Sequence, residues 1–288
     1  MFALTGASGW LGRNAIDAFD TFQTFNPSSS LRLFTSNGRD IYGRSSSRLR
    51  DILQVSDYAG LFHTAFAKRA VLNNSSVDQY TQQNRSISHL VTSFVEQSSP
   101  DLPVVVTSSG IARTPNARNS LNDDPYAYLK REEEIAISRL SSDRMVVIFR
   151  LYGAIGPHLD LAAHYALSSF ISQSLSSGLI QISSNSSIYR GYVYLPTFCE
   201  LVWSLLSNPL PPGCYYIDAC SYVFTIRDLA YLVAHEMGSR IENSVSISTS
   251  DLSYYCGDVQ PYLQLLSDRN ICEPTLSDQL KFTINGCR

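Results

Sequence analysis

Short runs of apolar residues recur along the first half of the chain. They span residues 2–5, 31–35, 60–66, 104–106 and 145–149. Runs of this length that are rich in β-branched and aromatic residues are typical of strands buried on both faces of a sheet. The polar residues 37–59, with serines at 45–47, predict a loop between the second and third runs.

Between these runs, apolar residues recur at the three-to-four-residue spacing of amphipathic helices. This spacing predicts helices over residues 13–19, 77–96 and 125–140, and Asp123 or Asp124 can cap the last of them. Strands that alternate with helices imply right-handed crossovers between parallel strands. The pattern therefore predicts an α/β fold with a Rossmann-type doubly wound parallel sheet.

The pattern changes after residue 156. A serine-rich stretch over 168–187 and a proline cluster over 209–212 predict shorter elements and loops. We expect a dinucleotide-binding Rossmann domain over 1–156 and a smaller C-terminal α/β substrate lobe over 157–288. Segments around 188–207 are expected to return to the first domain.

The amino-acid composition limits the kinds of partner that the protein can bind. The 288 residues are 44% hydrophobic and 16% charged, with a net charge of −3, as in an ordinary globular protein. No Lys/Arg stripe suits a nucleic-acid backbone, and no run approaches the roughly 20 apolar residues that span a bilayer. We expect no nucleic-acid or membrane partner.

The N-terminus lacks a signal-peptide pattern, which favours a cytoplasmic protein. The six cysteines form no C-x-x-C pair, and no histidine lies at zinc-ligand spacing, so we expect free thiols and no metal.

A glycine-rich turn follows the first strand and opens the first helix. In Thr5-Gly6-Ala7-Ser8-Gly9-Trp10-Leu11-Gly12 the first glycine permits a tight turn, the second lets the backbone approach a pyrophosphate, and the third lets helix and strand pack closely. The helix N-terminus then offers free N–H groups to phosphate. Residues 6–12 are therefore predicted to bind a dinucleotide.

The turn after the second strand bears on which dinucleotide binds. NAD usually requires a carboxylate there for the ribose hydroxyls, but this turn reads Thr35-Ser36-Asn37-Gly38-Arg39. Ser36 and Arg39 suit the 2′-phosphate of NADP, although Arg39 can equally be a solvated turn residue. The sequence slightly favours NADP over NAD.

Ser109, Tyr126 and Lys130 are the candidate catalytic residues. Tyr126 and Lys130 are four residues apart and share a helix face, so the ammonium can favour the phenolate. Ser109 ends a strand and can orient a substrate oxygen, with Tyr126 exchanging the proton. Ser108 and Tyr128 are neighbouring alternatives, but Tyr128 lacks a lysine four residues on.

Several segments together resemble the extended short-chain dehydrogenase/reductase family, specifically its NAD(P)-dependent nucleotide-sugar epimerase/dehydratase group. They are Thr5–Gly12, Phe62-His63-Thr64-Ala65, Asn84 after Tyr80, Tyr126–Lys130 with Glu134, Val147–Pro157 and Arg190–Tyr194. The resemblance covers nearly the whole chain.

The resemblance implies roles for further residues. It places His63, Thr64, Ala65, Asn84 and Lys130 at the cofactor. It places Ser109, Gly110, Arg113, Tyr126 and Arg190 at the substrate. It also implies oxidoreductase or isomerase chemistry in polysaccharide biosynthesis, and homodimers built from the helices over 77–96 and 125–140.

Departures from the family pattern narrow the reaction. Gly110-Ile111 stands where dehydratases of the group carry an acidic pair, so dehydration is not expected. Gly153 stands where many members have asparagine. We expect an epimerase or 4-ketoreductase acting on a nucleotide-activated sugar. The alternative is an NAD(P)-binding regulatory or sensor protein of the same fold.

Overall fold

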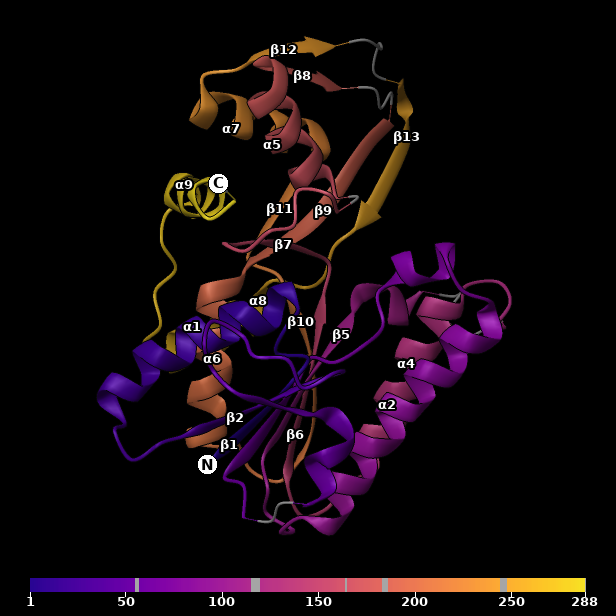
Figure 1. Cartoon of the computed structure of the whole chain (residues 1–288). Helices are drawn as coiled ribbons and strands as arrows, with labels where there is room; N and C mark the ends of the chain where they lie inside the picture. The colour runs from indigo at the N-terminus through magenta and orange to yellow at the C-terminus, as the bar shows by residue number, and fades with distance from the viewer. Residues whose placement is uncertain (55–56, 115–119, 164, 183–185, 244–247, 288) are drawn as a thin grey trace. The chain divides into compact units, whose positions relative to one another are not determined.

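The computed structural model describes residues 1–54, 57–114, 120–163, 165–182, 186–243 and 248–287. The chain forms two compact units. The first combines Met1–Arg150 with Cys199–Ile217, and the second combines Leu151–Phe198 with Asp218–Arg288. Figure 1 labels many of the helices and strands of both units. Among the described residues, no helix is both long and apolar enough to cross a membrane.

A seven-stranded sheet forms the centre of the first unit. Its strands are β1 (Phe2–Thr5), β2 (Leu31–Thr35), β3 (Ser46–Arg48), β4 (Gly60–His63), β5 (Val104–Ser109), β6 (Met145–Leu151) and β10 (Gly213–Ala219). They lie in the order β10-β6-β5-β4-β1-β2-β3. β1 is parallel to both β2 and β4, so the order reverses between β1 and β4, where such folds bind ligands. The predicted doubly wound α/β fold is confirmed.

Two helices cover one face of this sheet, and a cluster of aromatic side chains packs between them and the sheet. α1 (Trp10–Phe25) and α6 (Leu195–Ser207) lie on this face (Figure 1). The indole N–H of Trp203 donates to the Ala15 carbonyl at 2.9 Å. Its ring packs edge-on against Phe2, Phe19 and Phe62, with centroids 5.0–5.9 Å apart. This cluster fixes α1 against β1 and β4.

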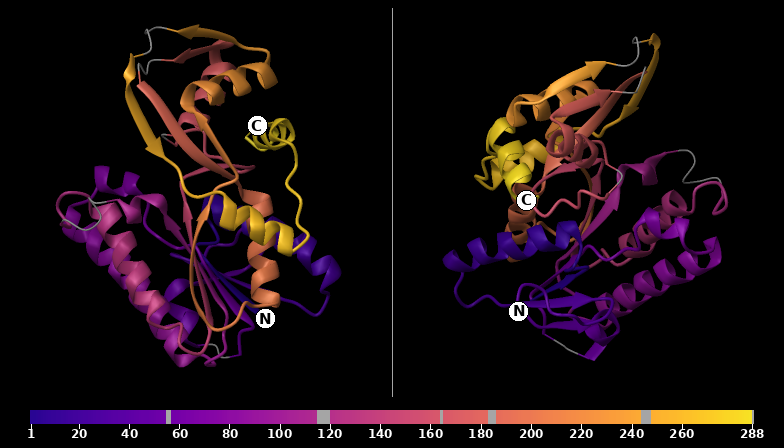
Figure 2. Two further views of the ribbon diagram at one scale, coloured as in Figure 1. Left: turned by 180° about the vertical axis from the view of Figure 1, so that it is seen from behind. Right: turned by 45° about the horizontal axis from the view of Figure 1, so that its top comes forward.

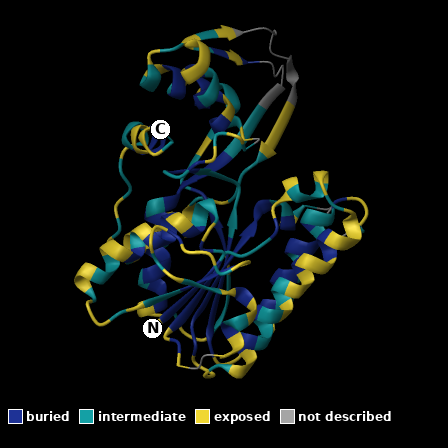
Figure 3. Cartoon of the chain, in the orientation of Figure 1, coloured by how far each residue is buried: buried dark blue, intermediate teal, exposed yellow. Residues whose placement is uncertain are grey.

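The opposite face packs on α2 (Val77–Gln97) and α4 (Pro125–Ser138), as both views in Figure 2 show. Val91, Phe94 and Val95 of α2 and Ile137 of α4 join the valines of β5 in one buried cluster. Figure 3 shows the resulting buried strands between partly exposed helices. Asp124, rather than Asp123, caps α4 by accepting from the Ala127 N–H at 3.1 Å.

The predicted loop over 37–59 is wrong in part. It contains β3 and a 3-10 helix, η1 (Leu49–Gln54). β3 is short and polar, so only its parallel pairing with β2, Thr35 opposite Arg48, identifies it. Leu49 and Ile52 are buried in the core below it. The strand expected over 60–66 ends at His63.

The second unit holds a mixed sheet and its helices. Its elements are β7 (Gly153–Ile155), α5 (Ala166–Ser177), β8 (Leu179–Ile182), β9 (Ser186–Tyr194), β11 (Tyr222–Thr225), α7 (Ile226–Met237), β12 (Arg240–Asn243), β13 (Ser248–Tyr255), α8 (Gln260–Asp268) and α9 (Leu276–Asn285). β9 pairs with β7, β11 and β13, and β8 pairs with β12.

The serine-rich stretch over 168–187 was expected to form short elements and loops, but its first half belongs to the helix α5. Leu167, Phe170 and Ile171 are buried at helical spacing, and their packing outweighs the low helix propensity of serine. Residues 183–185 of this stretch lie outside the described residues. All six cysteines are free.

Candidate active site

The glycine-rich turn has no room for a side chain at Gly6 or at Gly12. Gly6 has φ +74°, and a Cβ there would lie 2.6 Å from Thr64 Oγ1 and 2.7 Å from the Ala65 nitrogen. A Cβ on Gly12 would lie 2.6 Å from Ala7 Cα. The turn therefore holds β1, α1 and the end of β4 in close contact, and each position requires glycine.

The N-terminus of α1 is suited to an anion. Its first turn contains no acidic residue, and Gly9 at the N-cap has no side chain to accept from the first N–H groups. Ser8 is exposed, Trp10 and Leu11 are partly buried, and Ala7 is buried. The N–H groups and helix dipole of such an end attract phosphate.

The end of β4 forms the other side of the crevice at the switch point. The Thr64 N–H and hydroxyl both donate to the Thr5 carbonyl, at 3.2 and 2.7 Å. His63 is buried, and its Nδ1 lies 2.6 Å from the Thr5 hydroxyl. Its other ring nitrogen lies 3.2 Å from Glu133 Oε1. The side chain of His63 is thus engaged inside the protein, beside the backbone of Thr64 and Ala65.

Asn84 orders the loop that follows β4. Its Oδ1 accepts from the Ala67 N–H at 2.8 Å, and its amide donates to the Tyr80 carbonyl at 3.2 Å. The Tyr80 hydroxyl donates to the Ala67 carbonyl at 2.9 Å. Asn84 and Tyr80 thus hold the backbone N–H and the carbonyl of one residue, Ala67, in the loop after β4.

The turn after β2 presents Ser36 and Arg39 to solvent. The turn is closed by the Gly38 N–H, which donates to Thr35 Oγ1 at 2.9 Å. Arg48 was missed by the sequence analysis. Its Cγ would lie 3.2 Å from a Cβ on Gly38, so its stem passes along the same turn. Only the β2–β3 pairing brings this second arginine to the turn.

Ser109 and Tyr126 are brought together. Burial raises the pKa of the Tyr126 phenol, and a hydrogen bond with the Ser109 side chain opposes this by lowering that pKa. The buried Ser108 hydroxyl, in contrast, has no hydrogen-bond partner among the described residues. Tyr128 interacts instead with Arg85 of α2. Of these four side chains, Ser109 and Tyr126 are the two that the structure joins by a hydrogen bond.

Lys130 is buried and tightly held. Its Nζ donates to the Thr107 carbonyl at 3.0 Å and to Glu133 Oε2 at 2.9 Å. It also lies 3.8 Å from the centroid of the Phe66 ring. The same ring packs edge-on against Tyr126, with centroids 5.7 Å apart. Phe66 and Glu133 thus contact the predicted catalytic side chains. The sequence analysis did not identify these two residues.

The predicted substrate residues lie in both units. Gly110 and Arg113 begin and end a 3-10 helix, η3 (Gly110–Arg113), that follows β5 directly; Gly110 is buried and Arg113 is exposed. Arg190 lies on β9 in the second unit, with its guanidinium 5.5 Å from the centre of the Tyr255 ring.

Gly153 has a steric reason for departing from the family's asparagine. A Cβ there would lie 2.8 Å from the Gly191 carbonyl oxygen and from the Tyr192 ring. The close approach of β7 to β9 in the second unit therefore excludes any larger side chain at this position.

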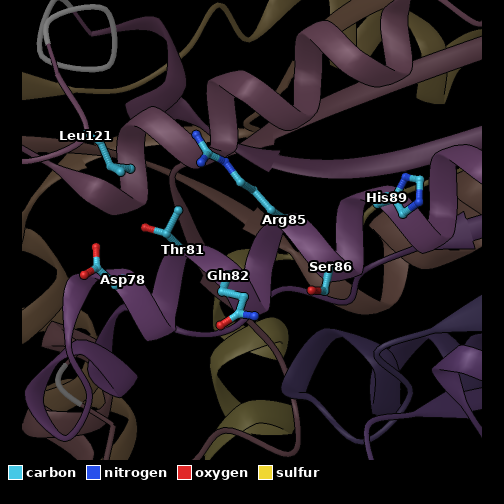
Figure 4. Close-up of a pocket in the computed structure, with 7 residues that line it drawn as sticks. All are labelled: Asp78, Thr81, Gln82, Arg85, Ser86, His89 and Leu121. Carbon is cyan, nitrogen blue, oxygen red and sulfur yellow. The ribbon is translucent and has the colours of Figure 1, made fainter.

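A separate shallow hollow of about 500 Å³ lies on α2 (Figure 4). Its lining is mostly polar, and Arg85 in it is bound by Glu132 of α4 through two bonds of 2.8 Å. None of the predicted cofactor or substrate residues lines it.

No protein-family model matches the chain, and no curated protein matches its sequence. Solved structures do match. The chain has the fold of nucleotide-sugar epimerases.

Three of the matching structures each align with 99% of the chain. A UDP-N-acetylglucosamine 4-epimerase from Methanobrevibacter ruminantium M1, in complex with UDP-N-acetylmuramic acid, is 17% identical over 97% of its own length, with a TM-score of 0.72. MoeE5 in complex with UDP-glucuronic acid and NAD is 16% identical over 98% of its length, with a TM-score of 0.74. The UDP-glucose 4-epimerase of Thermotoga maritima is 14% identical over 97% of its length, with a TM-score of 0.73.

Proposed function

We propose that the protein is an NAD(P)-dependent epimerase or 4-ketoreductase that acts on a nucleotide-activated sugar. The observation that carries the proposal is the pairing of Ser109, at the end of β5, with Tyr126 of α4, in the unit that also contains the tight glycine turn after β1. UDP-sugars are bound by similar structures with the same fold, which supports a sugar nucleotide as the substrate.

The residues divide the chemistry between them. A bound nicotinamide would accept or return a hydride at the sugar carbon. Ser109 would donate to the oxygen on that carbon, and Tyr126 would take its proton during oxidation or return it during reduction. The Gly6–Gly12 turn would hold the pyrophosphate against the N-terminus of α1. Lys130, which contacts the same Phe66 ring as Tyr126, would support the proton exchange of Tyr126.

Two observations bear on the choice between cofactors. Ser36, Arg39 and Arg48 border the turn where a ribose 2′-phosphate would lie, which supports NADP. One of the similar structures holds NAD, which supports NAD. We keep both within the proposal.

The test begins with the purified protein. An epimerase should carry bound nicotinamide, visible by absorbance and identified by mass spectrometry, and should convert a UDP-sugar without added cofactor. A ketoreductase should consume NADPH when a 4-keto nucleotide sugar is added. Binding of NADPH without turnover across a broad panel of sugar nucleotides would contradict the proposal and favour an NAD(P) sensor.

A further inference from the structure

Glu133 is a buried charged residue to which the proposed reaction assigns no part. Its side chain is 2% exposed. One carboxylate oxygen lies 3.2 Å from His63 Nε2, and the other accepts from Lys130 Nζ at 2.9 Å. The far side of the His63 ring contacts the Thr5 hydroxyl at 2.6 Å. A chain of polar contacts thus runs from β1 through β4 to Lys130.

A carboxylate is costly to bury unless each oxygen finds a partner. Burial raises the pKa of Glu133, but the Lys130 ammonium and the His63 hydrogen bond lower it more, so the net direction is down. Glu133 is therefore the anion that balances the buried Lys130 cation. His63 fixes the direction of that anion.

Glu133 lies on the same face of α4 as Tyr126 and Lys130, at positions i+7 and i+3 from them. An ammonium has three N–H groups, and two of those on Lys130 are directed at Glu133 and the Thr107 carbonyl. These two bonds set where the lysine stands against the Phe66 ring, which also contacts Tyr126.

We propose that Glu133 is a positioning residue for Lys130: its carboxylate, oriented by His63, pairs with the lysine ammonium and holds it against the Phe66 ring that also contacts Tyr126. This inference rests on the proposed function, in which Lys130 supports the proton exchange of Tyr126. Under this proposal, Glu133 and His63 join the residues that hold the catalytic side chains in position.

Other charged groups also face Tyr126. Arg69 and Asp124 form an ion pair at 2.8 Å; the arginine lowers the pKa of the phenol, whereas Asp124 raises it. Glu133 raises it as well. The residues that face Glu133 itself are Lys130 and His63. A test must therefore measure the reactivity of the Lys130 amine itself, because the behaviour of Tyr126 depends on several charged groups.

The first measurement is the rate at which Lys130 is reductively methylated by formaldehyde, followed by mass spectrometry. Only the neutral amine reacts, and a buried ammonium without its anion has a lowered pKa. Glu133→Gln should make Lys130 methylation at pH 8 about tenfold faster or more, because one pKa unit changes the neutral fraction tenfold. Glu132→Gln, the same change at an exposed site on α4, is the control. A rate within twofold of wild type in Glu133→Gln would overturn the proposal.

Folding and activity provide separate readouts. If Glu133→Gln does not fold, Glu133→Asp keeps the charge and should protect Lys130; methylation as fast as at exposed lysines in that variant would overturn the proposal. In the turnover assay, the alkaline limit of activity should move to lower pH in Glu133→Gln, and an unmoved limit would contradict it. If the wild-type protein converts no nucleotide sugar, the proposed function fails, while methylation still tests Glu133.

Discussion

At the scale of single residues, the account depends on the pairing of Tyr126 with Ser109. In the proposed mechanism the phenol exchanges the proton, and general acid–base groups contribute about 10²- to 10⁴-fold in rate. Tyr126→Phe should therefore lower kcat by about a thousandfold while leaving the dissociation constant for the dinucleotide within about threefold. Stopped-flow absorbance and fluorescence titration measure the two quantities. Full turnover in this variant would remove Tyr126 from the mechanism.

The direction of the Tyr126 pKa predicts a pH dependence. Burial raises that pKa, so the phenol is protonated at neutral pH, as an acid for the reductive step should be. The oxidative step needs the phenolate, so its rate should rise with pH, about tenfold per unit below the pKa. Ser109→Ala removes the hydrogen bond that lowers the pKa, and should move this rise to higher pH. A pH-independent oxidative rate in the wild-type protein would argue against Tyr126 as the base.

Gly6 allows a prediction with a matched control. Alanine at either Gly6 or Gly43 must adopt a positive φ, of +74° or +75°, which costs about 1–2 kcal/mol. Only Gly6→Ala also meets Thr64 and Ala65, whereas a Cβ on Gly43 meets nothing within 4 Å. Gly6→Ala should lose more unfolding free energy than Gly43→Ala and should also lose dinucleotide binding. Equal effects of the two substitutions would show that the contact of Gly6 with Thr64 and Ala65 leaves room for a methyl group.

The sequence predicts some site residues better than others. Gly6, Ser109 and Tyr126 stand in local motifs whose spacing carries the chemistry. Glu133 and Phe66 were missed because a glutamate among glutamates indicates a solvated helix face, and a single phenylalanine indicates core. Their roles depend on contacts across the fold, with His63 and Tyr126.

At the scale of elements, α4 is fixed by two ion pairs of different burial. Arg150 of β6 binds the buried Glu134 through bonds of 2.9 and 2.7 Å, whereas the Arg85–Glu132 pair with α2 is exposed. Glu134→Gln should cost about 3 kcal/mol because it leaves Arg150 without its buried anion. Glu132→Gln should cost less than about 1 kcal/mol. Urea denaturation of both variants makes the comparison, and similar losses would contradict it.

The β2–β3 edge predicts the cofactor preference. Hydrogen bonds to charged groups contribute about 1.5–3 kcal/mol, or roughly a factor of 10 to 100 in affinity. If NADP is the cofactor, Arg39→Ala and Arg48→Ala should each weaken NADPH binding about tenfold and leave NADH binding within twofold. Fluorescence titration with both dinucleotides decides the matter. Equal losses for NADPH and NADH would contradict a 2′-phosphate site at this turn.

Helices and strands were predictable where burial of one face makes apolar residues recur at a regular spacing. β1, β2, β5 and the helices α2 and α4 follow from their apolar spacing. β3 could not be predicted, since three polar residues on a sheet edge have no period and gain their conformation from pairing with β2. α5 was hidden by serines, although Leu167, Phe170 and Ile171 provide the helical spacing.

At the scale of the whole molecule, the chain keeps a fold that aligned structures share at 14–17% identity. The residues that determine this fold are few: the glycines between β1 and α1, the apolar strands and the aromatic core around Trp203. The fold could therefore be predicted from sequence, whereas the particular sugar could not.

The central claim is that this site moves a hydride to or from a sugar carbon with Tyr126 as the proton donor or acceptor. The direct test is a single-turnover reaction of wild-type protein with a 4-keto nucleotide sugar and reduced nicotinamide dinucleotide that carries two deuterium atoms at C4, analysed by mass spectrometry and NMR. The account predicts one deuterium at the sugar C4 with wild-type protein, and almost none with Tyr126→Phe that still binds the dinucleotide. No deuterium transfer by the wild-type protein, or equal transfer by Tyr126→Phe, would contradict it.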